Sequence, residues 1–303
     1  MSVATQLVIL SGKGGTGKTS FTASFAHLAS DTNLQGPNIL VDADVDAANL
    51  SLLLDPQNEI LNDFMGGSIA FINSDLCIGC GDCAEVCRYD ALGPDPKDES
   101  VYLVDPIACD GCAACFYACP QHAISMVRQQ EGLWFEADTQ WGKLYHAELF
   151  PGGENSGKLV TLLRQKAKLK ADETGSSLII IDGPPGIGCP VISACSGVDL
   201  GLIVTEPSMA GLHDLKRVFG VLKHFKIPVL VCINKADIYP EGTRQIYAFA
   251  EKENIKIIGE VPFDEHIPQA LLQGQPVTLT YPECDSSKAI RSVWYQVLKF
   301  MHA

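Results

Sequence analysis

Eight of the twelve cysteines in this chain fall between Cys77 and Cys119, in two runs that share one spacing. The runs are Cys77-x2-Cys80-x2-Cys83-x3-Cys87 and Cys109-x2-Cys112-x2-Cys115-x3-Cys119. Three thiolates at this spacing can hold a cubane iron–sulfur cluster, and the fourth cysteine of each run then ligates the cluster of the other run. The pattern predicts two [4Fe–4S] clusters, the first on Cys77, Cys80, Cys83 and Cys119 and the second on Cys109, Cys112, Cys115 and Cys87.

Other uses of clustered cysteines fit this chain less well. Zinc needs only four ligands and would not require two interlocked runs. Disulfide frameworks are typical of small secreted proteins, whereas this chain has 303 residues and enters the apolar run 6–10 without a basic segment or a cleavage site. We therefore expect a cytoplasmic protein, in which Cys195, Cys232 and Cys284 are packing residues.

A second segment with a chemical signature is Gly12-Lys-Gly-Gly-Thr-Gly-Lys-Thr19, which satisfies the pattern G-x-x-x-x-G-K-[ST]. Its glycines allow backbone N–H groups to converge on phosphates, and the helix that follows presents its positive end to them. Lys18 is expected to reach the β- and γ-phosphates, and the Thr19 hydroxyl is expected to ligate Mg²⁺. The expected nucleotide-binding residues are Gly12, Gly14, Gly15, Thr16, Gly17, Lys18, Thr19 and Ser20.

The segments that must position this loop alternate between short apolar runs and helical periods. Runs typical of strands buried on both faces occur at 7–10, 38–41, 178–181, 202–204 and 229–233. Helical periods occur at 18–30 and 212–225. This alternation predicts an α/β fold, with a mostly parallel sheet covered by helices on both faces.

The alternation stops between residues 65 and 141, where the cysteines, a turn-rich segment at 93–96 and strand-like pieces at 101–104 and 124–127 lie. We interpret residues 65–141 as an inserted α+β domain similar to bacterial ferredoxins. Arg88 stands where those ferredoxins have proline, a difference that removes no ligand. The P-loop domain is then discontinuous and comprises residues 1–64 and 142–303.

Charge and hydropathy limit the classes of partner. The chain has 22 Lys+Arg against 36 Asp+Glu, a formal charge of −14. This acidity argues against broad binding to nucleic acid or to an anionic membrane. No apolar run approaches the ~20 residues of a membrane span, and the apolar face of the C-terminal helical period, around Trp294, is expected to dock on the protein's own core.

The phosphate loop carries a second lysine, Lys13. The form K-G-G-x-G-K-T resembles the deviant Walker A motif of the MinD/ParA/Mrp superfamily of P-loop ATPases, to which nitrogenase iron protein is related. There the extra lysine reaches across a nucleotide-sandwich dimer to the partner's phosphates. The resemblance implies catalytic roles for Lys13 and Lys18, and an ATP-dependent homodimer or a dimer with a paralogue.

Two acidic segments extend the resemblance. Residues 40–50 look like the superfamily's first switch, which implies that Asp44 lies near the attacking water and Asp42 lies by the metal. Residues 179–187 look like Walker B running into the second switch, which implies that Asp182 holds Mg²⁺ through water. An acid at the end of a buried strand is where such a ligand must stand to face the P-loop.

The sequence is compatible with two bases, adenine and guanine. Cys232-Ile-Asn-Lys-Ala-Asp237 resembles the superfamily's adenine-contacting segment, in which Asn234 meets the base. It also satisfies N-K-x-D, the motif in which the acid, here Asp237, reads guanine in GTPases. The deviant Walker A motif belongs to ATPases, so that we favour ATP.

Taken together, the motifs resemble those of MinD-superfamily ATPases that contain an inserted ferredoxin domain. This resemblance implies a nucleotide-switched iron–sulfur ATPase whose clusters serve electron transfer to, or metallocofactor assembly on, an unknown partner protein. A MinD- or ParA-like positioning switch with redox-sensing clusters is the alternative. Cys189, which follows the second switch, is either a ligand of a bridging cluster or a packed free thiol.

Overall fold

The computed structural model describes residues 4–32, 34–153 and 155–301, and it divides into two compact units. The core unit comprises Met1–Asn62, Leu133–Leu149 and Ser156–Ala303. The cysteine unit comprises Asp63–Gly132 and Phe150–Asn155. This division differs from the expected boundaries, because residues 133–141 belong to the core unit and residues 150–155 belong to the cysteine unit.

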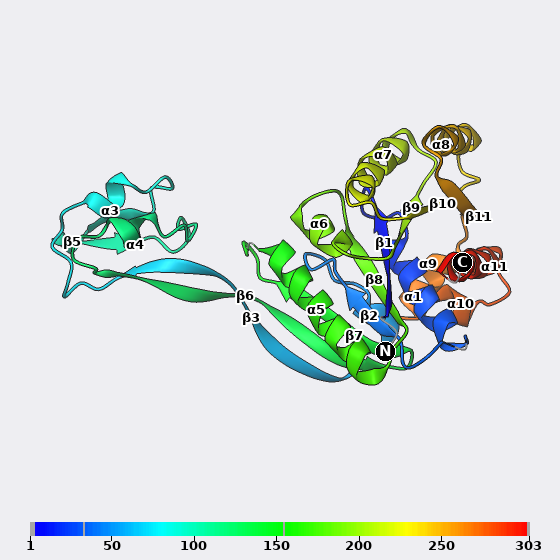
Figure 1. The fold of residues 1–303 in the computed structure, drawn as a ribbon, viewed down its shortest axis with the longest axis horizontal. Helices are drawn as coiled ribbons and strands as arrows, with labels where there is room; N and C mark the ends of the chain where they lie inside the picture. The colour runs from blue at the N-terminus through cyan, green and yellow to red at the C-terminus, as the bar shows by residue number, and fades with distance from the viewer. Residues whose placement is uncertain (1–3, 33, 154, 302–303) are drawn as a thin grey trace. The chain divides into compact units, whose positions relative to one another are not determined.

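In the described part of the chain, a nine-stranded sheet has the order β11-β10-β9-β1-β8-β2-β7-β6-β3 (Figure 1). The pairings from β11 through to β7 are all parallel, which confirms the predicted α/β fold with a mostly parallel sheet. The strands are β1 (Thr5–Ser11), β2 (Ile39–Asp42), β3 (Gln57–Ile72), β6 (Ile124–Thr139), β7 (Gly142–Leu149), β8 (Leu178–Pro185), β9 (Leu200–Thr205), β10 (Val229–Asn234) and β11 (Lys256–Val261).

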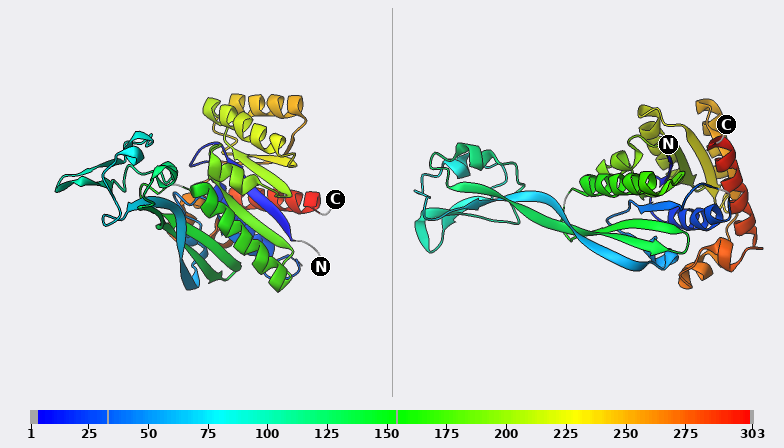
Figure 2. Two further views of the ribbon diagram at one scale, coloured as in Figure 1. Left: turned by 60° about the vertical axis from the view of Figure 1, so that its left-hand side comes forward. Right: turned by 60° about the horizontal axis from the view of Figure 1, so that its bottom comes forward.

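Helices cover both faces of this sheet, as Figures 1 and 2 show. One face carries the first helix and the C-terminal ones, and the other carries the helices between β7 and β11. The first group is α1 (Lys18–Ser30), α9 (His266–Leu272), α10 (Val277–Thr280) and α11 (Asp285–Met301), and the second is α5 (Ser156–Thr174), α6 (Cys189–Cys195), α7 (Met209–His224) and α8 (Pro240–Glu253). A short helix, α2 (Ser51–Leu54), follows β2.

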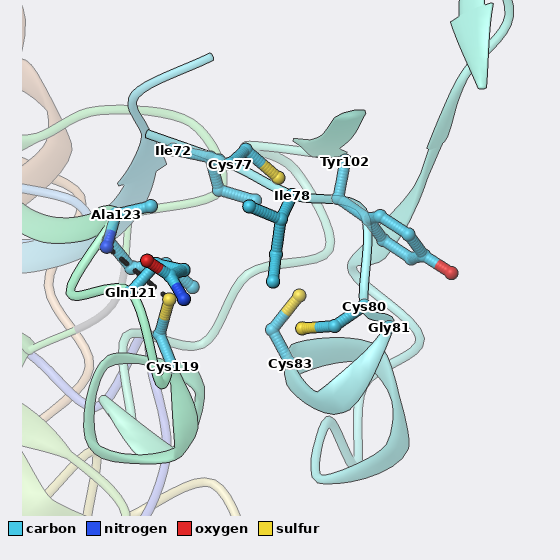
Figure 3. A pocket seen from close by; sticks show the side chains of 11 residues that line it. Ile72, Cys77, Ile78, Cys80, Gly81, Cys83, Tyr102, Cys119, Gln121 and Ala123 are labelled. Atoms are coloured by element: carbon cyan, nitrogen blue, oxygen red, sulfur yellow. Dashed lines mark hydrogen bonds between the residues drawn. The ribbon is translucent and has the colours of Figure 1, made fainter. Parts of the chain in front are cut away.

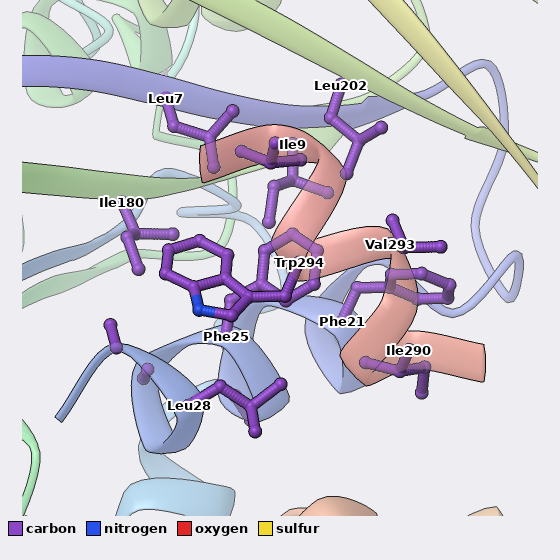
Figure 4. Packing of buried hydrophobic residues seen from close by; sticks show 14 of the residues in the cluster. Leu7, Ile9, Phe21, Phe25, Leu28, Ile180, Leu202, Ile290, Val293 and Trp294 are labelled. Atoms are coloured by element: carbon purple, nitrogen blue, oxygen red, sulfur yellow. The ribbon is translucent and has the colours of Figure 1, made fainter. Parts of the chain in front are cut away.

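The core between α1, α11 and the sheet is centred on Trp294 (Figure 4). Trp294 is 1% exposed, and its ring lies 4.9 Å from that of Phe25 on α1. Leu7 and Ile9 approach it from β1, because alternate residues of a strand share one face. The apolar face of α11 is therefore buried in its own unit, as the sequence predicted. Among the described residues, no helix is both long and apolar enough to cross a bilayer.

Two long strands, β3 and β6, run from the core unit into the cysteine unit. They run antiparallel, as three hydrogen-bonded pairs show: Asn58–Asp138, Asp63–Gln130 and Asn73–Ala123. As the residue number increases along β3, the number of its partner decreases. The sequence predicted only residues 124–127 of this pair. The cysteine unit further contains α3 (Asp82–Glu85), β4 (Leu92–Asp95), β5 (Asp98–Val104) and α4 (Ala114–Ala118), with β4 and β5 forming an antiparallel pair.

Candidate functional site

The phosphate loop joins the end of β1 to the start of α1, as the motif requires. Gly15 and Gly17 have φ values of 77° and 99°, which favour glycine. A Cβ at Gly17 would lie 2.6 Å from Nδ2 of Asn234, whereas Cβ atoms at Gly14 and Gly15 would meet nothing within 4 Å. Gly12 packs so closely on Asp214 that a side chain there would clash. The loop is thus held tightly at Gly12 and Gly17 and is open where phosphates would approach.

Lys18 is 6% exposed and faces the buried carboxylate of Asp182 at the end of β8. The hydroxyl of Thr22 donates to Oδ1 of Asp182 at 3.0 Å, and Thr19 also hydrogen-bonds this carboxylate. Burial raises the pKa of Asp182, while Lys18 and the two hydroxyls act in the opposite direction. The structure therefore brings Lys18, Thr19 and Asp182 together, and a hydroxyl beside a carboxylate is an oxygen set that suits Mg²⁺.

Asp42 lies beside Asp182, because the two residues are paired in the parallel register of β2 and β8. Its carboxylate is fully buried and accepts the backbone N–H groups of Asp44, Asn49 and Leu50 at 3.1, 3.1 and 2.9 Å. Burial and the charge of Asp182 raise the pKa of Asp42. The carboxylate of Asp42 thus stabilises the conformation of the 42–50 loop.

Asp44 occupies the first turn of that loop and is half-buried. Burial raises the pKa of its carboxyl, Lys18 lowers it, and Asp46 raises it further. Asp46 itself is exposed. The positive charge of Lys18, at the start of α1, therefore acts on the carboxyl groups of both Asp44 and Asp182.

A cavity opens between the phosphate loop and the segment after β11. It has a volume of about 1290 Å³ and is lined by Gly15, Gly17, Lys18, Thr19, Ser20, Asn49, Leu52, Leu53, Asn234, Lys235, Pro262, Phe263, Asp264, Ile267, Pro268 and Leu271. The lining is polar at the loop end and mostly apolar beyond it, as expected of a site for phosphates and an aromatic base.

The two base-reading candidates have different surroundings. Asn234 lies in the cavity wall, where its Nδ2 donates to the carbonyl of Thr16 at 2.8 Å. Asp237 is absent from that wall, and its Oδ1 accepts the backbone N–H of Phe263 at 2.7 Å. Asp237 therefore fixes the segment that carries Phe263, and its contact is with the protein's own backbone.

Lys13 forms an ion pair with Glu206, which follows β9 directly. The other carboxylate oxygen of Glu206 lies 3.5 Å from Nζ of Lys235, and that amine also donates to the carbonyl of Gly15 at 3.2 Å. The sequence alone does not single out Glu206, because a single glutamate after a strand matches no motif. Its position becomes informative only once β9 is placed next to β1.

Four of the cysteines line one cavity in the cysteine unit (Figure 3). They are Cys77, Cys80, Cys83 and Cys119, which come from both runs. Cys80 and Cys83 lie on one side of the cavity and Cys119 on the opposite side in the view of Figure 3. Sγ of Cys119 accepts the backbone N–H of Ala123 at 3.3 Å.

The other four cysteines line a second cavity of similar size. The two volumes are about 340 and 310 Å³, and the second cavity contains Cys87, Cys109, Cys112 and Cys115. Burial raises the pKa of Cys83 to about 11 and raises that of Cys115, and neighbouring thiols add to both effects. Thiols this close resist ionisation unless a cation offsets their charge, so each set fits a metal centre that binds thiolates.

The remaining four cysteines line neither of these cavities. Cys195 and Cys232 are buried, and burial raises the pKa of Cys195 to about 12. Cys284 is partly buried and its Sγ contacts the hydroxyls of Ser286 and Ser287. Cys189 is exposed at the start of α6.

Comparison with known proteins identifies the family. The model of the CobQ/CobB/MinD/ParA nucleotide-binding domain matches residues 7–277. An uncharacterized protein of Methanocaldococcus jannaschii is 32% identical over 303 residues, which cover 99% of each chain. An iron–sulfur cluster carrier protein of Aquifex aeolicus is 28% identical over 127 residues, or 38% of this chain and 35% of that protein.

Among solved structures, the septum site-determining protein MinD of Pyrococcus horikoshii in complex with Mg-ADP is similar, with a TM-score of 0.59 and 20% identity. The match covers 98% of this chain and 97% of that one. At this identity the likeness concerns the fold. The family-model match and the full-length relative together show that this chain belongs to the CobQ/CobB/MinD/ParA nucleotide-binding family.

Proposed function

We propose that this protein is a nucleotide-switched iron–sulfur ATPase. The observation that carries the proposal is the sorting of the eight clustered cysteines into two cavities, four in each, on a chain of a nucleotide-binding family. Each set combines three cysteines of one run with the last cysteine of the other, as the spacing rule for paired [4Fe–4S] clusters requires. When bound, such clusters transfer single electrons.

In the core unit, each site residue would have its own role in the binding or hydrolysis of ATP. Lys18 and the loop N–H groups would bind the β- and γ-phosphates, and Thr19 and Asp182 would hold Mg²⁺, with Asp42 shaping the loop behind them. Asp44, half-buried near Lys18, would orient the attacking water. Asn234 and the apolar wall around Phe263 would hold the adenine. Lys13 would act on the phosphates of a second copy.

Electron transfer is the role that the cysteine unit supports best, because each cavity has a complete set of four cysteine ligands within one chain. A carrier that delivers its cluster needs ligand positions that can exchange, whereas four thiolates from one chain favour retention of the cluster. The partial similarity to an iron–sulfur cluster carrier protein supports cluster delivery as the second candidate.

Anaerobic purification tests the proposal. We expect about eight irons and eight acid-labile sulfides per chain, together with Mg²⁺-dependent ATP hydrolysis. Tetrahedral zinc without sulfide would refute the cluster assignment. Incubation with an apo-ferredoxin then separates the two roles, since electron transfer predicts retained iron and delivery predicts its appearance in the acceptor.

A further inference from the structure

The second lysine of the phosphate loop is already neutralised inside its own chain. Its ammonium group pairs with Oε1 of Glu206, whose side chain is only 17% exposed, while the Lys13 side chain is 39% exposed. Oε2 of the same carboxylate faces Lys235 at 3.5 Å. Glu206 thus lies between Lys13 of the loop and Lys235, which follows β10.

The fold places Glu206 there for a simple reason. β9 lies next to β1 in parallel register, with Ile203 opposite Leu10, so the residues after both strands emerge at the same edge of the sheet. Ser208 also contacts Glu206, donating to Oε1 at 3.3 Å. Burial raises the pKa of Glu206, but the hydrogen bond and charge of Lys13, aided by Lys235 and Ser208, outweigh it and leave the pKa below its usual value. The carboxylate is therefore charged at neutral pH.

The two loop lysines consequently differ in what they face. Lys18 is directed to the acids of its own site, Asp44 and Asp182. Lys13 instead forms its ion pair with Glu206. A lysine that is to act on a second copy must first leave this intrachain partner.

We propose that Glu206 is a positioning residue that holds Lys13 within its own chain and thereby sets the threshold for nucleotide-dependent pairing of two copies. The inference rests on the proposed function, in which Lys13 reaches the phosphates of a second copy. In the unpaired chain Glu206 pairs with both Lys13 and Lys235. In the paired state the phosphates of the second copy take over the charge of Lys13, and Glu206 keeps Lys235, which continues to hold the carbonyl of Gly15.

The energetic consequence follows from competition between two partners for one ammonium group. Pairing must offset the loss of the Lys13–Glu206 ion pair in each copy. The apparent affinity between copies is therefore lower when the fraction of chains with a released Lys13 is smaller. A partly exposed ion pair contributes up to about 1 kcal/mol, or about fivefold in an equilibrium constant. Two identical copies must break two such pairs, so the effect on the dissociation constant of the pair reaches about 25-fold.

The test compares Glu206→Gln with the wild-type chain under a non-hydrolysable ATP analogue. Sedimentation velocity over a concentration series gives the dissociation constant of the pair, and we expect it to fall by up to about 25-fold when both copies carry the substitution. Glu253→Gln is the matched control, because Glu253 forms a 2.9 Å pair with Lys223 away from the loop, and it should leave the constant unchanged. Without nucleotide, acetylation of Lys13, followed by mass spectrometry, should be several times faster in Glu206→Gln.

The outcomes distinguish a failure of the proposed function from a failure of the inference about Glu206. A wild-type chain that binds no ATP analogue defeats the proposed function, and the inference with it. If the analogue binds but Glu206→Gln pairs at the wild-type concentration, or if no variant pairs at all, the inference is overturned while nucleotide binding stands. Should Glu206→Gln fail to fold, Glu206→Asp, which retains the charge but withdraws it by one methylene, must show the same direction of change with a smaller amplitude.

Discussion

The two units of this protein are stabilised in different ways. The core unit buries whole strands, with Leu7, Val8, Ile9 and Leu10 of β1 all fully inaccessible. The apolar cluster around the cavities of the cysteine unit contains four buried residues, Ala70, Cys83, Cys115 and Ile124, of which two are expected metal ligands. The core unit therefore has a large apolar core, whereas the apolar cluster of the cysteine unit is small and includes two of the expected metal ligands.

Charge reinforces the contrast. The cysteine unit contains 12 acidic and 3 basic residues, a formal charge of −9, and the rest of the chain contributes −14 − (−9) = −5. If the proposed clusters are bound, we expect a small unit with a small apolar core and concentrated like charge to depend on them for stability, since metal binding supplies folding free energy where apolar burial does not. The predictions that follow test this difference between the units.

The largest effect is expected from loss of a buried ligand. Cys83→Ser should remove a cluster and abolish hydrogen-exchange protection across much of residues 63–132, because the same residue is both ligand and core. Exchange monitored by mass spectrometry should show the core unit's strands still protected. Cys189→Ser, at an exposed position, is the control. Retained protection in an iron-free cysteine unit would show that its fold does not need metal.

The converse change should damage only the core unit. Trp294→Ala removes the largest fully buried side chain and should lower the free energy of unfolding of that unit by about 3–5 kcal/mol. Urea denaturation followed by circular dichroism measures this loss, and iron content at zero urea should be unchanged. Tyr295→Ala is the neighbouring control, since Tyr295 is 58% exposed and its loss should cost less than about 0.5 kcal/mol. A parallel fall in iron content would show that the units are not independent.

Catalysis gives a smaller and more local test. Lys18→Ala removes the buried charge that faces Asp44 and Asp182, and ATP hydrolysis should fall about a hundredfold because the developing phosphate charge loses its main partner. Initial-rate measurements check this, with Lys252→Ala on α8 as an exposed control. Both clusters should be retained. A variant that hydrolyses ATP at the wild-type rate would contradict the assignment of Lys18.

The smallest effect concerns the base. Because Asp237 accepts a backbone N–H at 2.7 Å, and asparagine can accept the same bond, Asp237→Asn should alter ATP affinity by no more than about threefold. Competition binding should find ATP preferred over GTP in both proteins. A wild-type preference for GTP that Asp237→Asn relaxes would instead establish Asp237 as a guanine-reading residue.

The core unit could be predicted well because its signals are local. The apolar run in β1, the glycines of the loop and the helical period of α1 are adjacent in sequence, and α1 begins at Lys18 as expected. The sorting of cysteines into two sets follows from a spacing rule, and the two cavities contain those same sets.

The long strands could not be predicted from such signals. Most of β3 between residues 57 and 63 is exposed, so that it lacks the alternation of a half-buried strand. Glu206 was missed for a different reason, since its position beside the phosphate loop depends on which strands are neighbours. Neighbouring strands are a property of the sheet order, which no single stretch of sequence contains.

The antiparallel pairing of β3 and β6 has a consequence for the architecture as a whole. The side chains of Asp63 and Gln130 are joined by a 2.7 Å hydrogen bond, so the chain leaves for the cysteine unit and returns from it at nearly the same place. A tight turn could close that gap with little loop-closure cost, and the core unit would retain its hairpin. The antiparallel pair of β3 and β6 is therefore a position at which another domain with closely spaced ends could replace the cysteine unit. The order of the parallel strands would stay the same.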